Sequence, residues 1–529
     1  MINKKQIYPV REYLSACRAI IQYFTGTVSN TSCKFSNGIY LLIFILAGTL
    51  LGCVATRPII SPPVISPPDP LKILQNNINS ILSDSIFVSA HASIKVVSLD
   101  SGKILFERES KALMNPASNM KLITSAAALS VLDTGYQFKT SVYVDDNTTD
   151  GDVAQNIYLK GYGDPNLTTL DLDSLAFAVR QLGINTIANN IIVDDSFFDD
   201  NYWGAGWTWD DESDPDAPYI NALSVNKNCV RINITTDLKN ISVSLEPITD
   251  FVTVLNKATI VLDSIRIPLR VRRLSLSNGN TLVVEGDIFP YNRVTQKISL
   301  RCPEIYAGTL FKESLRRAGI SVFGDVMNDA VPNGIHEIAQ HLQPIKEVIE
   351  NMNKQSDNLS AENTLKVIGA LNNNIPGSAK SGVFIEKRFL SILGMDTAKF
   401  SIVDGSGVSR YNLLSADQLV QFLAAMKKQP RLFQMFYNSL PVAGVDGTLT
   451  DRMSNYPVAN NLHAKTGTLN GVSCLSGYVQ TRDGEMLAFS MMMQNFITAA
   501  VDYRQVQDKI GAMLAGFSRK MITQKGPTK

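Results

Sequence analysis

The sequence SNMKLITSAAALSVLD (residues 118–133) combines a reactive pair of side chains with a helical pattern. It is rich in helix-forming residues and is followed by Gly135, so a helix is predicted to begin near Ser118 and to end before that glycine. A serine at a helix start lies at the positive end of the helix dipole. Lys121, three positions later, lies on the same face within reach of the serine hydroxyl. It could take the serine proton if burial and a second cation, for which Lys465 is the candidate, lowered its pKa from ~10.4 to about 7. An exposed capping serine beside a solvated lysine is the alternative.

Ser356-Asp357-Asn358 is a second short string of hydrogen-bonding residues, placed between two helical patterns. Such a string often caps a helix, and capping is compatible with a role in catalysis. In the catalytic interpretation, Ser356 relays a proton between Lys121 and a leaving amine. Asn358 would then contact a substrate amide.

Lys465-Thr466-Gly467-Thr468 opens a segment with the pattern of a β-strand. Lys465 and Thr466 can hold a substrate carboxylate, and Gly467 would let a substrate backbone approach the strand. The backbone N–H groups of Ser118 and Thr468 are expected to form an oxyanion hole. Together the three strings supply the parts that acyl transfer to a serine needs.

The three strings, in this order, are the set found in penicillin-binding proteins and serine β-lactamases. The chain resembles the class C low-molecular-mass penicillin-binding proteins, the D-Ala-D-Ala carboxypeptidase/endopeptidase family of the penicillin-binding protein 4 type. The resemblance covers residues from about 75 to 520. Further family-like strings are GYGDP (161–165), YINALSVNKN (219–228), MNK (352–354), DGSGVSR (404–410) and GVDGTL (444–449).

The resemblance implies an α/β (α+β) fold in which a β-lactamase/transpeptidase-like domain is split by nested insert domains. It implies removal of terminal D-alanine and cleavage of peptide crosslinks in peptidoglycan, with penicillins acylating Ser118 and with no metal or cofactor. Arg410, which closes the DGSGVSR string, is expected to line the cleft. Asp211, in the run WTWDD (207–211), is expected to meet a cationic peptide side chain. The alternative for that run is an acidic surface loop anchored by buried tryptophans.

The spacing of the strings indicates where the insert lies. Ser118 and Ser356 are more than twice as far apart in sequence as Ser356 and Lys465, and the interval is β-rich and poor in helical patterns. One or two inserted domains are therefore expected. The predicted segments are a first transpeptidase-like part at 71–138, a β-rich insert at 139–305 and a second transpeptidase-like part at 306–529.

The N-terminal residues have the pattern of an export signal. Basic residues precede the apolar run IYLLIFILAGTLLG (39–52), which suits a signal-peptide core and ends at Cys53 as a lipobox does. We therefore predict a signal peptide with lipobox at 1–53 and lipidation of Cys53. An ordinary cleaved signal or a short anchor is the alternative. The proline-rich residues 54–70 predict an extended linker, and the protein is expected in the periplasm or cell envelope, held to a membrane by its lipid.

Composition excludes several other classes of protein. The net charge is +1, which gives no support for nucleic-acid binding, and the four histidines lack the spacing of a metal site or a Ser-His-Asp triad. Cys229 and Cys302 could pair in an exported protein, or could be free thiols like Cys474. Segment 145–152 lacks the ligand spacing of a calcium loop. A serine β-lactamase and an inactive wall-binding protein are the competing functions, and self-association into a homo-oligomer is left open.

Overall fold

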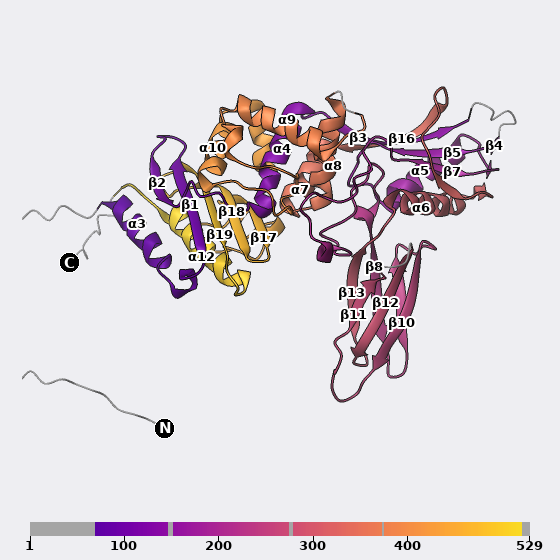
Figure 1. The fold of residues 1–529 in the computed structure, drawn as a ribbon, viewed down its shortest axis with the longest axis horizontal. Coiled ribbons are helices and arrows are strands. Elements are labelled where there is room, and N and C mark those ends of the chain that lie inside the picture. The colour runs from indigo at the N-terminus through magenta and orange to yellow at the C-terminus, as the bar shows by residue number, and fades with distance from the viewer. Residues whose placement is uncertain (1–68, 146–151, 275–278, 373–374, 521–529) are drawn as a thin grey trace, which may run out of the picture. The chain divides into compact units, whose positions relative to one another are not determined.

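A computed structural model describes residues 69–145, 152–274, 279–372 and 375–520 (Figure 1). The predicted signal peptide, Cys53 and the linker up to residue 68 lie outside these residues, as does most of segment 145–152. Pro70, the last residue of the predicted linker, is the first residue of a helix, α3 (Pro70–Ile81). Within the described ranges no helix combines the length and apolarity needed to cross a bilayer.

One five-stranded sheet joins the two ends of the described chain. Its order is β17-β18-β19-β1-β2, and its strands are antiparallel neighbours. His91 at the start of β1 lies opposite Gln494 at the end of β19, so strands from the beginning and the end of the chain share the sheet centre. The strands are β1 (His91–Ser98), β2 (Ile104–Arg108), β17 (His463–Leu469), β18 (Val472–Gln480) and β19 (Met486–Gln494).

Helices cover both faces of this sheet. Met491 and Met493 of β19 pack with α3 and α12 (Ala500–Gly516), whereas Met492 packs with the helices of the opposite face, because successive strand residues point to opposite sides. On that opposite face α4 (Met120–Val131) is buried along most of its length. Its neighbours there are α7 (Ile345–Lys354), α8 (Asn358–Leu371), α9 (Ala379–Ile392), α10 (Ala416–Lys427) and α11 (Pro430–Ser439).

The insert begins with a second five-stranded sheet, of order β15-β7-β5-β3-β16. The helices α5 (Thr169–Gln181) and α6 (Pro303–Arg317) share a core with it. The strands are β3 (Gln137–Val144), β5 (Ile157–Gly161), β7 (Ile191–Asp194), β15 (Val326–Asn328) and β16 (His336–Pro344). A small parallel sheet adds β4 (Val153–Ala154), β6 (Thr186–Ile187) and β14 (Ser321–Val322).

Two three-stranded sheets form the rest of the insert and contribute to the same apolar core (Figure 1). Their orders are β13-β8-β9 and β10-β12-β11. The strands are β8 (Cys229–Thr236), β9 (Ile241–Glu246), β10 (Val252–Ile260), β11 (Arg270–Arg273), β12 (Asn280–Ile288) and β13 (Arg293–Ser299).

The structure differs from the predicted boundary between residues 305 and 306. Tyr306, Phe311 and Leu315 of α6 are buried in the core of the insert, and β16 pairs with β3, so the chain leaves the insert only at Ile345. The amphipathic pattern of α6 reports that one face is buried but not which sheet covers it. The insert was also expected to be poor in helices, but it contains the 13-residue helix α5.

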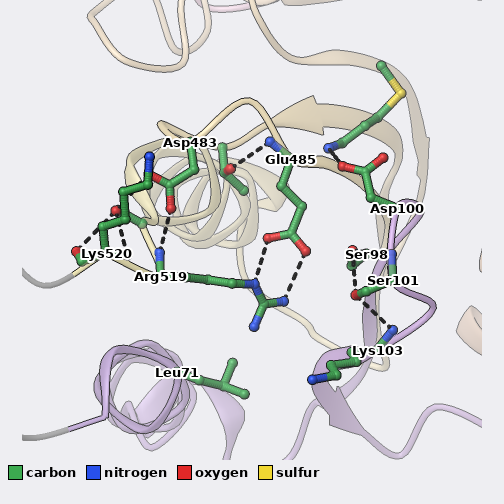
Figure 2. Close-up of polar contacts among 12 residues, drawn as sticks. Leu71, Ser98, Asp100, Ser101, Lys103, Asp483, Glu485, Arg519 and Lys520 are labelled. Atoms are coloured by element: carbon green, nitrogen blue, oxygen red, sulfur yellow. Dashed lines mark hydrogen bonds and ion pairs between the residues drawn. The ribbon is translucent and has the colours of Figure 1, made fainter.

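Polar contacts fasten the C-terminal end of the described chain to the large sheet. Arg519 donates two hydrogen bonds of 2.9 Å to Glu485 in the turn before β19, and its backbone N–H donates to Asp483 (Figure 2). Asp100, in the turn between β1 and β2, accepts from the Met486 backbone N–H. These contacts join two turns of the sheet and the C-terminal segment.

The structure also answers the question left open about the cysteines. Cys229, Cys302 and Cys474 are free thiols, so the disulfide considered between Cys229 and Cys302 is not formed. Burial raises the pKa of Cys229 and of Cys474 to about 12, which keeps both thiols protonated and unreactive.

Candidate active site

Ser118 lies in a single turn of 3₁₀-helix, Ala117–Asn119, that leads directly into α4. Ala117 has a positive φ of 45°, an uncommon conformation for a residue with a side chain. It is held there because its N–H donates to the Asn115 side chain at 2.8 Å, while that side chain donates to the backbone carbonyl of Ser409. The turn leaves Ser118 half-buried at the surface of a cavity.

Lys121 is fully buried next to Ser118. Its Nζ donates to Ser118 Oγ at 3.0 Å, to Asn358 Oδ1 at 2.5 Å and to the Ser406 carbonyl at 2.7 Å. Burial lowers the pKa of Lys121 from 10.5 to about 8, and the negative charges of nearby carboxylates, Asp404 first, oppose this fall. A substantial neutral fraction is therefore available near pH 8.

Asn358 has partners inside the protein and also lines the cavity. Its oxygen accepts from Lys121, and one N–H of its amide donates to the backbone carbonyl of Asp216 in the insert. A second N–H and a second lone pair remain for the predicted contact with a substrate amide. The observed geometry makes Asn358 a link between the buried lysine and the insert.

Ser356 and Lys465 form a second hydrogen-bonded pair. Ser356 lies in the turn between α7 and α8 with φ of 60°, and it accepts a hydrogen bond of 2.8 Å from Lys465 Nζ on β17. Burial, and then the charge of Lys121, hold the pKa of Lys465 well below its usual value. Burial is the first cause of the lowered pKa of both lysines. The repulsion between the two ammonium groups is reciprocal, so it also disfavours protonation of Lys121, in the direction predicted from the sequence.

Gly467 has a structural role that the sequence did not indicate. A Cβ at this position would lie 2.9 Å from the Pro116 carbonyl oxygen and 3.1 Å from the Ser118 backbone nitrogen. The glycine therefore allows β17 to pack directly against the turn that carries the serine, and the predicted approach of a substrate backbone stays a prediction. Thr468 follows at the exposed edge of the strand.

These residues border a cavity of about 570 Å³. Its lining includes Ser118, Ser356, Asn358 and the threonines of β17. Aspartates of the insert and arginines of the C-terminal part complete it. The lining residues used below are Ser118, Asp211, Asp214, Asp216, Ser356, Asn358, Thr448, Arg452, Thr466, Thr468 and Arg504.

The predictions that Asp211 and Arg410 lie at the cavity have different outcomes. Asp211 does line the cavity, although its carboxylate also accepts two hydrogen bonds from Thr208. Arg410 is exposed and is not among the lining residues, because its guanidinium reaches across to the Asn470 carbonyl at 3.2 Å. Of the two tryptophans that the surface-loop alternative expected to be buried, Trp207 is buried and Trp209 is exposed, and the loop that carries them reaches the cavity.

Sequence reasoning missed three residues that support Lys121. Glu362 accepts from the N–H groups of Gly405 and Ser406, the turn whose carbonyl receives Lys121. Glu362 is four residues after Asn358 on α8, so helical spacing could have indicated it. Burial raises the pKa of Glu362 to about 7.

The other two residues are Asp404 and Trp207, and they join the insert to the turn at residues 405–407. Asp404 accepts hydrogen bonds from Gly407 N–H, at 2.9 Å, and from Trp207 Nε1, also at 2.9 Å. Trp207 and the DGSG string had been noted in the sequence, but nothing in their spacing showed that they meet. Within the described ranges, no group of three or more His, Cys, Asp or Glu side chains is arranged to hold a metal ion.

Comparison with known proteins agrees with this geometry. The model of the family "D-Ala-D-Ala carboxypeptidase 3 (S13)" matches residues 74–517. The chain belongs to the D-Ala-D-Ala carboxypeptidase 3 (S13) family. S13 enzymes are serine peptidases, so the chain is a hydrolase of the serine type, and the family predicted from the motifs is confirmed.

Curated relatives in the S13 group share most of the chain. A D-alanyl-D-alanine carboxypeptidase of Actinomadura sp. (strain R39) is 33% identical over 471 residues, which cover 84% of this chain and 85% of that protein. D-alanyl-D-alanine carboxypeptidase DacB of Haemophilus influenzae is 27% identical over 467 residues, covering 85% and 94%. The crystal structure of penicillin binding protein 4 (dacB) from Haemophilus influenzae matches with a TM-score of 0.74 at 23% identity, covering 83% of this chain and 99% of that one. The mixed α/β fold predicted from the sequence is thus confirmed.

Proposed function

We propose that this chain hydrolyses the terminal D-Ala-D-Ala bond of peptidoglycan stem peptides, and peptide crosslinks, through an acyl ester on Ser118. β-Lactam antibiotics would acylate the same serine. The observation that carries the proposal is the pair of buried lysines, each hydrogen-bonded to a serine at the cavity: Lys121 to Ser118 and Lys465 to Ser356. A serine hydroxyl needs such a base to become a nucleophile.

Acylation of Ser118 requires a base for the serine proton and donors for the oxyanion. Ser118 Oγ attacks the carbonyl carbon while Lys121 accepts its proton, and the N–H groups of Ser118 and Thr468 stabilise the oxyanion. The C–N bond then breaks with its electron pair on nitrogen. The proton that Lys121 took from Ser118 passes to this amine through the Ser356 hydroxyl, which accepts one proton and donates another, so the proton leaves with the product amine.

Hydrolysis of the ester repeats these steps with water in place of the amine. Lys121 takes a proton from the attacking water, the C–O bond to Ser118 breaks, and the serine oxygen recovers the proton. Asn358 acts as a positioning residue, because it holds both Lys121 and the insert. Asp211, with Asp214 and Asp216, forms an acidic edge suited to a cationic peptide side chain.

We also propose that the chain is exported to the periplasm or cell envelope and carries lipid on Cys53. The support is the basic N-terminal region, the apolar run 39–52 and the cysteine that ends it. Mass spectrometry of the N-terminal peptide from membrane fractions should find a lipid-modified Cys53, and Cys53→Ser should release the protein from the membrane. Recovery of an unmodified N-terminus from the membrane would contradict this.

The reaction is tested by incubating the full-length chain with defined monomeric and crosslinked muropeptides and analysing the products by mass spectrometry. Release of D-alanine from monomers and separation of crosslinked dimers are expected. If neither product forms, the proposal is wrong. A serine β-lactamase is distinguished by the lifetime of the penicillin adduct, which should be far longer here than the turnover time for peptide.

A further inference from the structure

The cavity beside Ser118 is lined by charged residues of both signs. The insert contributes Asp211, Asp214 and Asp216, and the C-terminal part of the chain contributes Arg452 and Arg504. Coulomb interactions repel a substrate carboxylate from the aspartates and attract it to the arginines. The position of positive charge therefore decides where an anionic group binds.

Of the two arginines, Arg452 has its charge balanced within the protein. Its guanidinium donates to the Asp508 carboxylate at 3.1 and 2.6 Å and to the Gln507 side chain at 3.1 Å. Arg504, on α12, instead donates to the Thr468 hydroxyl at 3.3 Å, and it forms no ion pair with any residue in the described part of the chain. Its charge is available to a ligand.

The other candidate cation lies behind the cavity-lining residues. Lys465 is fully buried, and its Nζ donates to Ser356 Oγ, which lines the cavity, and to the Thr466 carbonyl. The hydroxyls beside it do face the cavity, and Thr466 Oγ1 lies 2.8 Å from Thr448 Oγ1. A carboxylate placed there meets hydroxyl donors, and Arg504 is the arginine of the cavity lining that has no carboxylate partner among the described residues.

We propose that Arg504 is a specificity-determining residue that binds the C-terminal carboxylate of the peptide substrate, together with the hydroxyls of Thr466 and Thr468. A guanidinium offers N–H donors in a planar fork that matches a carboxylate. The inference rests on the proposed function, since it concerns recognition by the same cavity. The positive charge that pairs with the carboxylate would then come from helix α12, which lies outside all three catalytic strings.

The test compares one charged probe with its neutral counterpart. Acylation of the full-length chain by benzylpenicillin and by benzylpenicillin methyl ester is followed by the mass of the covalent adduct over time. Arg504→Gln removes the charge, Arg504→Lys keeps a charge without the planar fork, and Lys509→Gln removes an exposed charge from the same helix as a matched control. KM and kcat are measured in parallel with a peptide ending in D-Ala-D-Ala.

Arg504→Gln should slow acylation by benzylpenicillin on the order of 10- to 100-fold, the loss expected when a hydrogen bond to a charged group is removed. Its rate with the methyl ester should equal that of the wild type, which also shows that the variant is folded. Arg504→Lys should be intermediate, Lys509→Gln unchanged, and KM should rise more than kcat falls. Equal effects on both penicillins, or no effect on either, would overturn the assignment while leaving the proposed function intact. No acylation of the wild type would overturn both.

Discussion

The pH dependence of Ser118 acylation follows directly from the burial of Lys121. Only the neutral lysine can accept the serine proton, so the acylation rate should rise with pH as Lys121 loses its own proton. With a pKa of about 8, roughly one eleventh of Lys121 is neutral at pH 7 and roughly ten elevenths at pH 9, which predicts a rise of about tenfold. An exposed lysine of ordinary pKa would be almost fully protonated across this range.

A second variant should shift the midpoint of this rise in acylation rate with pH, the inflection of the pH–rate profile. It changes Glu362, which lies near Lys121. Glu362, with a pKa of about 7, is mostly ionised at pH 8 to 9, and its negative charge raises the pKa of Lys121. Glu362→Gln removes that charge but keeps an oxygen for the N–H groups of Gly405 and Ser406. The inflection should therefore move to lower pH, so the variant should acylate faster than the wild type below pH 8.

The assay is the second-order rate of adduct formation with labelled penicillin, measured at constant ionic strength from pH 6 to 10. Glu350→Gln, which removes a surface carboxylate from the neighbouring helix α7, is the matched control and should leave the inflection in place. A rate that is flat between pH 7 and 9, or an inflection that moves upward in Glu362→Gln, would refute the assignment of Lys121 as the base.

Three further variants test the site. Ser118→Ala should form no covalent adduct with penicillin, as judged by intact mass, and an undiminished adduct would place the nucleophile elsewhere. Gly467→Ala should lower the acylation rate by ~10² or more, because the new Cβ displaces β17 from the serine turn. Gly135→Ala, whose Cβ meets nothing within 4 Å, is its control, and equal rates in both would contradict the packing argument. Trp207→Phe removes a hydrogen bond from buried Asp404 and should lower the free energy of unfolding by about 1–3 kcal/mol in urea, whereas an unchanged value would show that this bond is dispensable.

Local patterns in the sequence were sufficient to place most of the elements that carry the site. The helix after Ser118 and the strand after Lys465 follow from propensity and from periodicity, which depend on neighbouring residues only. The interval between the strings also indicated an insert. Its end was misplaced because α6 has the same amphipathic pattern whether it covers one sheet or the other.

What the sequence determined by itself is the set of reactive groups and their order: a serine with a lysine one helical turn away, a capping serine, and a lysine at the start of a strand. Only the tertiary structure decided how those groups are used. The partner of each lysine, the contact of Asn358 with the insert and the position of Arg504 beside Thr468 depend on contacts between residues that are distant in the chain. Burial, which sets the pKa of Lys121, is a property of the packed whole, and no local pattern of residues records it.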